Sequence, residues 1–235
     1  MRSRDSSGVP PRQSNRFVRE FLASTRGVVV AERYLDIQAR QRDFLPIMRD
    51  IKEAGADVIF STVVGRGTSF LYQAYADAGF DPKRMPIASL TTTEAELRAM
   101  GLDVGEDHVT AACYFEGVES EANAAFVARF KKRFGSDAST NVCAEAAYFQ
   151  VHLFARALEK TNSLATDDLR PIVLGSAFEA TQGRVRIDPV SGHADLWTRI
   201  GVANRKGQFD LIRQSLAPVQ ADPFLICASG ARGQA

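Results

Sequence analysis

Residues 57–97 read DVIFSTVVGRGTSFLYQAYADAGFDPKRMPIASLTTTEAEL, and this stretch contains two strand–loop–helix units in succession. The apolar run Asp57–Ser61 predicts a buried strand, and the apolar spacing over Phe70–Ala78 predicts a helix that ends at a glycine. Pro86–Leu90 predicts the next strand, which leads into the hydroxyl side chains of Thr91–Thr93. Open α/β sheets bind ligands outside the carboxyl ends of their strands. We therefore expect the loops after these two strands to form a small-molecule site.

Helices and strands alternate outward from this stretch. The alternation continues to residue 115, which indicates βαβ units and predicts an α/β fold with a parallel sheet flanked by helices. The other predicted helices are 15–24 (capped by Ser14 or Asn15), Phe44–Ala54, Ser120–Phe134, Val142–Leu158 and Asp167–Leu174, and the other predicted strands are Gly27–Ala31, Val109–Tyr114, Gly183–Ile187, Leu196–Val202 and Phe209–Arg213.

The composition is that of a soluble globular protein, with 45% hydrophobic and 24% charged residues in a chain of 235. Its net charge of +1 argues against direct binding of nucleic acid, which usually requires a strongly basic surface. Residues 1–42 hold nine Arg and four acidic residues, so this segment is either a solvated Arg-rich end or a basic arm. The absence of interleaved aromatic residues favours the solvated end.

The sequence predicts no membrane insertion, because no run approaches the roughly 18 apolar residues of a spanning helix. The first residues lack the apolar core of a secretory signal. Cys113, Cys143 and Cys227 are odd in number and far apart, which favours reduced thiols in the cytoplasm. We predict neither a metal site nor a cofactor.

The sharpest polar group is Thr91–Thr93 with Glu94 and Glu96. A neutral polar ligand with N–H and C=O groups needs short hydroxyl side chains at a strand end. However, Thr93 and Glu96 also have the spacing of a capping box, which closes a helix start without any ligand. The two interpretations are compatible if Thr93 and Glu96 form the cap while Thr91 and Thr92 face a cleft.

The other loop, Thr62–Thr68, contains Val64, Gly65 and Gly67. It lacks the third glycine of a dinucleotide fingerprint and the Lys-Ser/Thr of a phosphate-binding loop. A tight turn between strand and helix is the interpretation that these residues favour.

No pattern predicts catalysis. His108, His152 and His193 are scattered, and no Gly-x-Ser-x-Gly elbow is present. Cys143 and His152 fall on different faces of one predicted helix, so they cannot pair as nucleophile and base. We predict a binding protein, with an enzyme that uses Ser, Glu or His as the alternative.

Four runs carry a family resemblance: VIFSTVVG, IASLTTTEAEL, CAEAAYFQ and ATQGRVRID, the last followed by His193. They resemble the amide- and urea-binding branch of the type I periplasmic-binding-protein-like family, and most closely its amide-sensing negative regulators of aliphatic amidase expression. The resemblance covers about residues 12–223. It implies two α/β lobes joined by three crossovers, a small amide or urea in the cleft, and an RNA-binding antiterminator partner released on lobe movement.

The alternative within the same family is the substrate-binding component of an ABC transporter for urea, amides or branched-chain amino acids. That alternative implies a periplasmic location, with a signal peptide and a first lobe upstream.

The resemblance also implies a domain organisation in which the first-lobe sheet is missing before Arg12, so that the chain is truncated at its N-terminus. Of the family's ligand contacts, it implies Thr91 as the best match, with Thr92, Val64 and Thr62 as weaker ones. The implied segments are 1–13 (non-homologous or disordered), 14–115 with 183–215 (second lobe), 116–182 (helices of an incomplete first lobe) and 216–235 (C-terminal tail).

The predicted helix 142–158 is apolar nearly all round, and Glu145, His152 and Arg156 form one narrow polar stripe. In the intact family fold this helix would cover the missing sheet. We therefore expect an exposed apolar face that makes the chain aggregation-prone, homo-oligomeric through this helix, or dependent on a separate first-lobe fragment.

Overall fold

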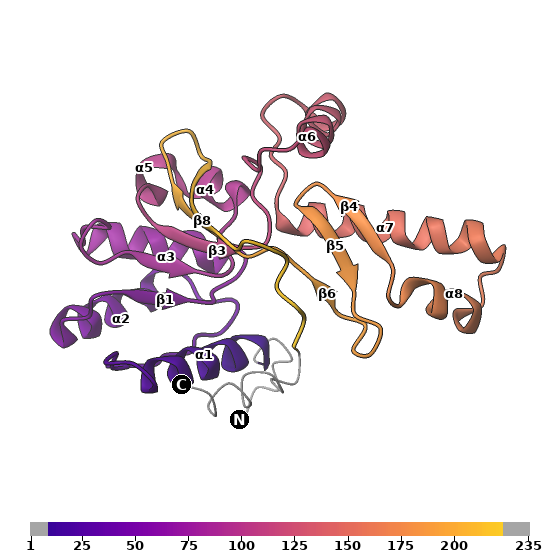
Figure 1. The fold of residues 1–235 in the computed structure, drawn as a ribbon. Coiled ribbons are helices and arrows are strands. Elements are labelled where there is room, and N and C mark those ends of the chain that lie inside the picture. The colour runs from indigo at the N-terminus through magenta and orange to yellow at the C-terminus, as the bar shows by residue number, and fades with distance from the viewer. Residues whose placement is uncertain (1–8, 223–235) are drawn as a thin grey trace. The chain divides into compact units, whose positions relative to one another are not determined.

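The computed structural model describes residues 9–222, which divide into two compact units. The first holds residues 9–111 and 201–210, and the second holds residues 112–200 and 211–222. The helices are α1 Val9–Ala23, α2 Gln41–Ala54, α3 Arg66–Asp77, α4 Glu94–Met100, α5 Leu102–Gly105, α6 Glu121–Phe134, α7 Val142–Thr161 and α8 Thr166–Val173 (Figure 1). The strands are β1 Ile59–Ser61, β2 Ile87–Ser89, β3 Val109–Ala112, β4 Ala177–Ala180, β5 Gly183–Ile187, β6 Ala194–Asp195, β7 Arg199–Ala203 and β8 Phe209–Gln214.

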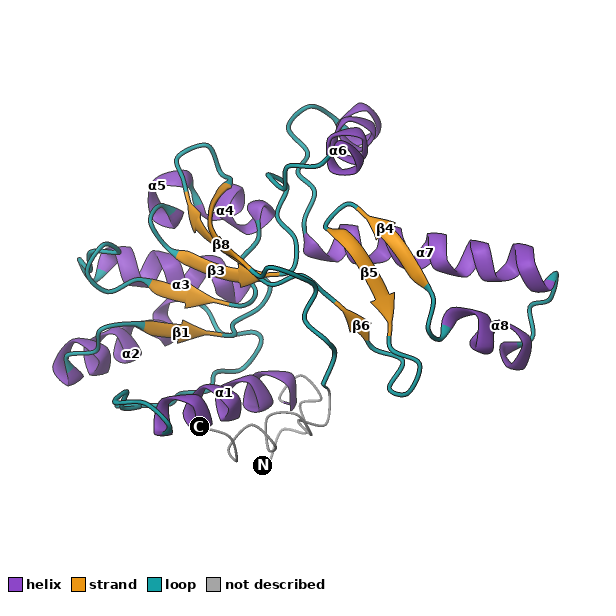
Figure 2. Cartoon of the chain, in the orientation of Figure 1, coloured by secondary structure: helices purple, strands orange, loops and turns teal. Residues whose placement is uncertain are grey.

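The larger sheet has the strand order β1-β2-β3-β7-β8. Strands β1, β2 and β3 pair in parallel, which places Ser61 opposite Ser89 and Ser89 opposite Thr110. Helices alternate with these strands along the chain (Figure 2). The predicted α/β fold with a parallel sheet flanked by helices is confirmed, and its register aligns the hydroxyl side chains at the carboxyl ends of β1 and β2.

The core of the first unit forms around α3, which buries Leu71, Tyr72 and Tyr75. The ring of His108 makes edge-on contacts with Tyr72 and Tyr75, at centroid distances of 4.7 and 4.8 Å. Its Nδ1 accepts the N–H of Ile87 at 2.9 Å, so this nitrogen carries no proton. This histidine is therefore a core residue and does not face a site.

The second unit packs α7 against an antiparallel sheet of β4, β5 and β6. The apolar cluster consists of Phe149 and Leu153 from the helix, and Phe178, Ala180, Val185 and Ile187 from the strands. The outer side of α7 exposes Val151 at 66% and Phe154 at 47%, which agrees with the exposed apolar face expected from the family resemblance.

Glu145 departs from the predicted polar stripe, because it is fully buried. Its carboxylate accepts hydrogen bonds from Thr181 Oγ1 at 3.1 Å and from Gln182 Nε2 at 2.7 Å. The helical pattern placed this residue beside His152 and Arg156, but hydrogen-bonding partners from a distant hairpin draw it inward.

The predicted strand Gly27–Ala31 was wrong. The segment is extended but pairs with no strand among the described residues, and Val28, Val29 and Val30 are exposed. It is held instead through Glu32, which accepts hydrogen bonds from Asn15 and Arg19 of α1. A run of valines predicts a strand only if a neighbouring strand completes its backbone hydrogen bonds.

Several boundaries also differ from the predictions. Helix α1 begins at Val9, before the predicted Ser14 or Asn15 cap and inside the segment 1–13 that was predicted to be non-homologous or disordered. Only the second half of the predicted strand Leu196–Val202 lies in a strand, β7, because β6 ends at Asp195. Residues 183–200 group with 112–182 in one compact unit, whereas the predicted second lobe combined 14–115 with 183–215. The assignment to lobes stays a prediction, and Cys227 lies outside the described residues.

Candidate functional site

The loops that follow β1 and β2 lie against each other at one edge of the sheet. The Leu90 N–H donates to the Ser61 carbonyl at 3.2 Å. The Thr91 hydroxyl donates to the Val63 carbonyl at 2.6 Å. The structure therefore brings together the two loops that the sequence predicted as a site, and Thr91 is the side chain that joins them.

Ser89 organises the second loop from the end of β2. Its Oγ accepts the backbone N–H groups of Thr91 and Thr92, both at 3.0 Å, and the hydroxyl of Thr92 at 2.8 Å. The two lone pairs of this oxygen are shared among these three donors. Since the Thr91 proton is used on the Val63 carbonyl, Ser89 is the donor in its contact with Thr91 Oγ1, at 3.3 Å.

The donor directions then follow along a chain of hydroxyl groups. Tyr72 donates to Thr92 at 3.0 Å, because the Thr92 proton is used on Ser89. Burial raises the pKa of Tyr72 to about 12, although its hydrogen bonds to Thr92 and Ser89 oppose the rise, so the phenol stays protonated. The relay Tyr72–Thr92–Ser89–Thr91 ends on the Val63 carbonyl and fixes the orientation of every hydroxyl group in it.

The four predicted ligand contacts occupy different environments. Thr62 and Thr91 are half-buried, and Val64 is exposed at 44%. Thr92 is buried, and its hydroxyl group is occupied by Ser89 and Tyr72. Thr91 donates to Val63 and accepts from Ser89, which leaves one lone pair on its oxygen for an outside donor.

The first loop ends at the N-terminus of α3. The N-cap is Gly65, with φ of 63° and ψ of −140°, and no side chain caps the helix. The first-turn N–H groups and the positive end of the helix dipole therefore lie directly after the loop. Thr91 thus supplies an acceptor on one loop, and α3 supplies donors on the other.

The predicted capping box at α4 is present. The Glu96 carboxylate accepts the Thr93 N–H at 3.0 Å, and the Thr93 hydroxyl accepts the Ala95 N–H at 3.3 Å. These two side chains close the helix start, so the predicted cap is confirmed, whereas Thr92 is buried and the ligand role of Thr91 stays a prediction. Sequence reasoning missed Ser89 and Tyr72, whose roles depend on strand register and on a contact 20 residues away.

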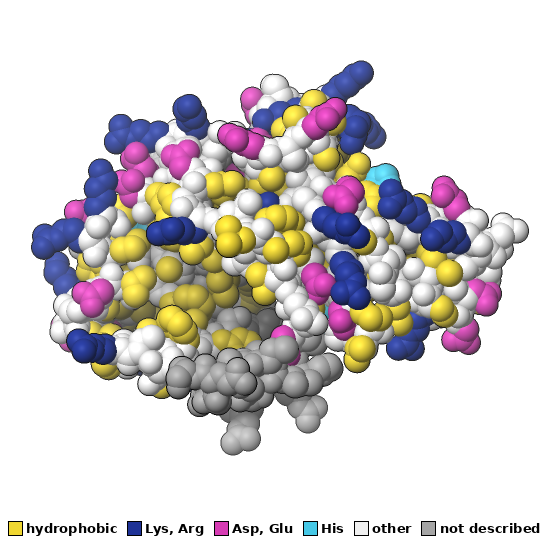
Figure 3. All heavy atoms as spheres, in the orientation of Figure 1, with side chains coloured by type: hydrophobic (Ala, Val, Ile, Leu, Met, Phe, Trp, Pro, Cys, Tyr) yellow, Lys and Arg dark blue, Asp and Glu magenta, His cyan; other side chains and the backbone are white. Residues whose placement is uncertain are grey.

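No group of three or more His, Cys, Asp or Glu that could hold a metal ion occurs within residues 9–222. Burial lowers the pKa of His108 to about 4, and His193 lies exposed in a turn. None of the described helices is long and apolar enough to cross a membrane. On the face displayed in Figure 3, basic and acidic side chains are intermixed.

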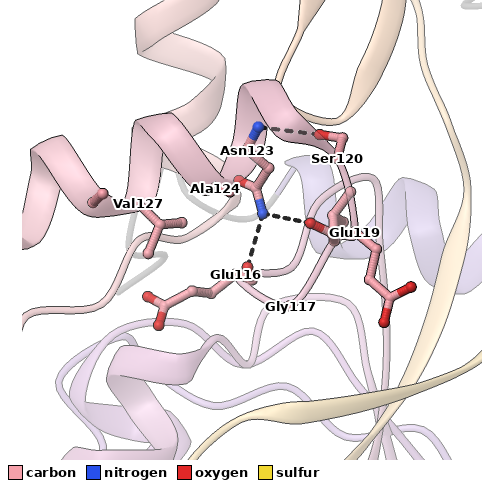
Figure 4. Close-up of a pocket in the computed structure, with 9 residues that line it drawn as sticks. Glu116, Gly117, Glu119, Ser120, Asn123, Ala124 and Val127 are labelled. Carbon is pink, nitrogen blue, oxygen red and sulfur yellow. Dashed lines mark hydrogen bonds between the residues drawn. The ribbon is translucent and has the colours of Figure 1, made fainter.

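A separate cavity of about 480 Å³ lies in the second unit, at the start of α6 (Figure 4). Asn123 there donates to the carbonyls of Glu116 and Val118, at 2.9 and 2.7 Å. The Glu116 carboxylate accepts hydrogen bonds from Lys131 and from the Thr140 N–H. These polar groups hold their own loop in shape, so we assign the cavity no ligand.

Comparison with known proteins identifies the family. A model described as a periplasmic binding protein domain matches residues 5–229. Leu/Ile/Val-binding protein homolog 6 of Brucella abortus (strain 2308) is 29% identical over 156 residues, which are 64% of this chain and 40% of that protein. A protein named limonene hydroxylase, from Geobacillus stearothermophilus, is 26% identical over 126 residues, which are 54% of this chain and 23% of that protein.

Two solved structures show the same fold. A solute binding protein of an ABC transporter from Rhodopseudomonas palustris HaA2, in complex with p-hydroxybenzoic acid, has a TM-score of 0.78 and 25% identity, over 92% of this chain and 59% of that one. A leucine-, isoleucine-, valine-, threonine- and alanine-binding protein from Brucella ovis has a TM-score of 0.74 and 19% identity, over 89% and 55%.

The chain thus spans less than two thirds of the length of these proteins. The predicted resemblance to periplasmic binding proteins is confirmed, whereas the amide- and urea-binding branch and the N-terminal truncation stay predictions. Because the family model covers nearly the whole sequence, the chain belongs to the periplasmic binding protein family.

Proposed function

We propose that the loops after β1 and β2 form one wall of a site for a small polar molecule, which the protein binds without transforming it. The observation that carries this proposal is the position of Thr91. Its hydroxyl oxygen keeps one lone pair for a ligand, next to the uncapped N-terminus of α3. Thr62 and Val64 complete this wall. Thr92 is buried and stabilises it through its hydrogen bonds to Ser89 and Tyr72.

A short-chain amide or urea matches these groups. Its N–H group can donate to Thr91, while its carbonyl accepts from the first-turn N–H groups of α3. Val64, exposed beside them, offers contact to a short alkyl group. The sequence resemblance supports this ligand class, and with it a cytoplasmic regulator of amidase expression that holds an RNA-binding antiterminator.

The second candidate is a transport component that binds a small carboxylate in the periplasm. A carboxylate is well suited to an uncapped helix N-terminus. The Rhodopseudomonas palustris neighbour, crystallised with p-hydroxybenzoic acid, and the relative named a Leu/Ile/Val-binding protein homolog support this alternative.

The test is a titration of this chain with acetamide, urea, 4-hydroxybenzoate and leucine, followed by the amide NMR signals of Val64 and Thr91. We expect acetamide to shift both signals, and Thr91→Val to weaken its affinity about tenfold because a half-buried acceptor is lost. Shifts with 4-hydroxybenzoate or leucine alone would favour the transport component, and a response to none of the four would contradict both candidates.

Thr68→Val is the matched control. Thr68 also donates to the Val63 carbonyl, at 3.1 Å, but its side chain is buried. It should lower stability and leave the affinity for acetamide unchanged. Equal affinity of Thr91→Val and the native protein would remove Thr91 from the site.

A further inference from the structure

The chain passes from one compact unit to the other three times, after Ala111, Ile200 and Asp210. Each passage lies within a strand, and these strands are the neighbours β3, β7 and β8 of one sheet. Any movement of one unit against the other must therefore bend the backbone at these three places.

Arg199 lies at the second passage and bonds to chain segments beside the other two. Its Nε donates to Gln214 Oε1 at 2.8 Å, and its Nη1 donates to the Cys113 carbonyl. Cys113 is two residues beyond the first passage, and Gln214 is four residues beyond the third. The third partner group is the Gln182 carbonyl, which accepts from Nη2 at 2.7 Å. One guanidinium thus ties together the chain at all three passages.

This guanidinium is 3% exposed, and its burial is compensated within the second unit. Burial lowers the pKa of Arg199, while the charge of Glu145 opposes that change. Glu145 also holds the Gln182 side chain, and thereby the residue whose carbonyl accepts from Arg199. The Trp197 ring lies 5.4 Å from the guanidinium carbon.

Gly183 permits this close arrangement. Its φ of +106° is unfavourable for other residues, and a Cβ there would lie 2.6 Å from the indole nitrogen of Trp197. The hairpin between β4 and β5 can therefore approach Trp197 and Arg199 only with glycine at this position.

We propose that Arg199 is the positioning residue of a hinge, which holds the three passing segments as one block on the side of the second unit. Bending is then confined to the residues on the other side of the three passages. The proposed ligand binding would use this movement, but the role of Arg199 does not depend on which ligand binds, and its test needs none.

The test is hydrogen–deuterium exchange of the whole chain, resolved by peptide. Reporter amides include Ser215, which donates to the Thr198 carbonyl at 2.8 Å, and Thr198, which donates to Ser215 Oγ at 3.1 Å. We expect Arg199→Gln to accelerate exchange at least about tenfold in 112–115, 198–201 and 211–216, with peptides of α3 and α7 unchanged. Acceleration spread evenly over the second unit, or none at the three passages, would overturn the proposal.

Two further variants separate geometry from charge and from folding defects. Arg199→Lys keeps the charge but cannot reach three acceptors. Its amides in the same three segments should therefore exchange as fast as those of Arg199→Gln. Full protection in the Lys variant would show that charge alone suffices and would overturn the hinge role.

Gln214→Ala removes one exposed partner of Arg199 and should accelerate exchange in residues 211–216 alone. This variant tests the proposal if Arg199→Gln does not fold, and unchanged exchange in 211–216 would then overturn it. Arg205→Gln, which breaks an exposed ion pair with Glu106, is the control and should change no passage.

Discussion

Buried polar side chains in the first unit are fixed by the direction of each hydrogen bond. His108 shows this most clearly, because its Nδ1 accepts from the Ile87 N–H and its ring is enclosed by Tyr72 and Tyr75. Protonation would remove that acceptor and place a charge in the core. Burial accordingly lowers the pKa of this imidazole from 6.5 to about 4.

The lowered pKa of His108 predicts that the fold becomes less stable in acid. Between pH 6.5 and 4 the unfolded chain binds a proton at this residue that the folded chain excludes, so the free energy of unfolding falls as the pH falls. The contribution of neutral His108 to the free energy of unfolding is complete above pH 6.5, and about 3 kcal/mol of it is lost by pH 4. Urea unfolding at pH 7, 5.5 and 4.5 measures this loss.

His108→Gln provides the comparison, because its amide oxygen can accept from Ile87 without titrating. The variant should be less stable at pH 7 and lose less stability on acidification. His193→Gln, at an exposed turn position, should behave like the native chain. Parallel pH profiles for His108→Gln and the native protein would exclude His108 as the source.

Among the elements, α4 depends on its cap because it is only seven residues long. Thr93→Ala removes the hydroxyl that accepts the Ala95 N–H and should lower the free energy of unfolding by about 1 kcal/mol. Denaturant unfolding at pH 7 measures the change. Ala99→Ser, on the exposed surface of the same helix, should cost about 0.5 kcal/mol or less. An equal loss in both variants would mean that the cap contributes nothing.

Local sequence patterns predicted the elements that complete their own contacts. Three strands of the sheet are short apolar runs between loops: Ile59–Ser61, Ile87–Ser89 and Val109–Ala112. Their alternation with helices along the chain predicted that they pair in parallel. The valines at 28–30 have the same local character, yet they form no strand because no strand within residues 9–222 pairs with them. Pairing is a property of the fold and cannot be seen in five residues.

For the candidate site, the sequence likewise predicted which loops meet but not the hydrogen bonds that form between distant residues. Parallel topology placed the loops of Thr62 and Thr91 at one edge of the sheet, and the structure brings them into contact. The hydroxyl relay was not predictable, since Tyr72 reaches Thr92 through tertiary packing. Likewise, Glu145 meets Thr181 and Gln182 across more than 35 residues, a separation at which local periodicity carries no information.

At the scale of the molecule, the exposed side of α7 is the feature that sets solution behaviour. Val151 and Phe154 lie on it, outside the apolar cluster of the second unit. We expect the chain to self-associate or to bind a hydrophobic dye at micromolar concentration. Sedimentation velocity and dye fluorescence measure the two outcomes.

The double change Val151→Glu and Phe154→Glu should shift the chain toward the monomer and reduce dye fluorescence. Val190→Glu is the control, because it places the same charge on a turn residue that is 92% exposed. A native chain that is monomeric, melts cooperatively and binds no dye would contradict this prediction.

The pairing of β3 with β7 also has a consequence for the order of synthesis. The backbone of Ala203 bonds to that of Asp107 and His108, so the edge of β3 stays open until β7 has been made. Ala112 and Arg199 are 87 residues apart, which corresponds to about 4–17 s at ribosomal rates. During that interval the nascent chain presents an unfinished sheet outside the ribosome, and the sheet is completed only after β7 and β8 have been made.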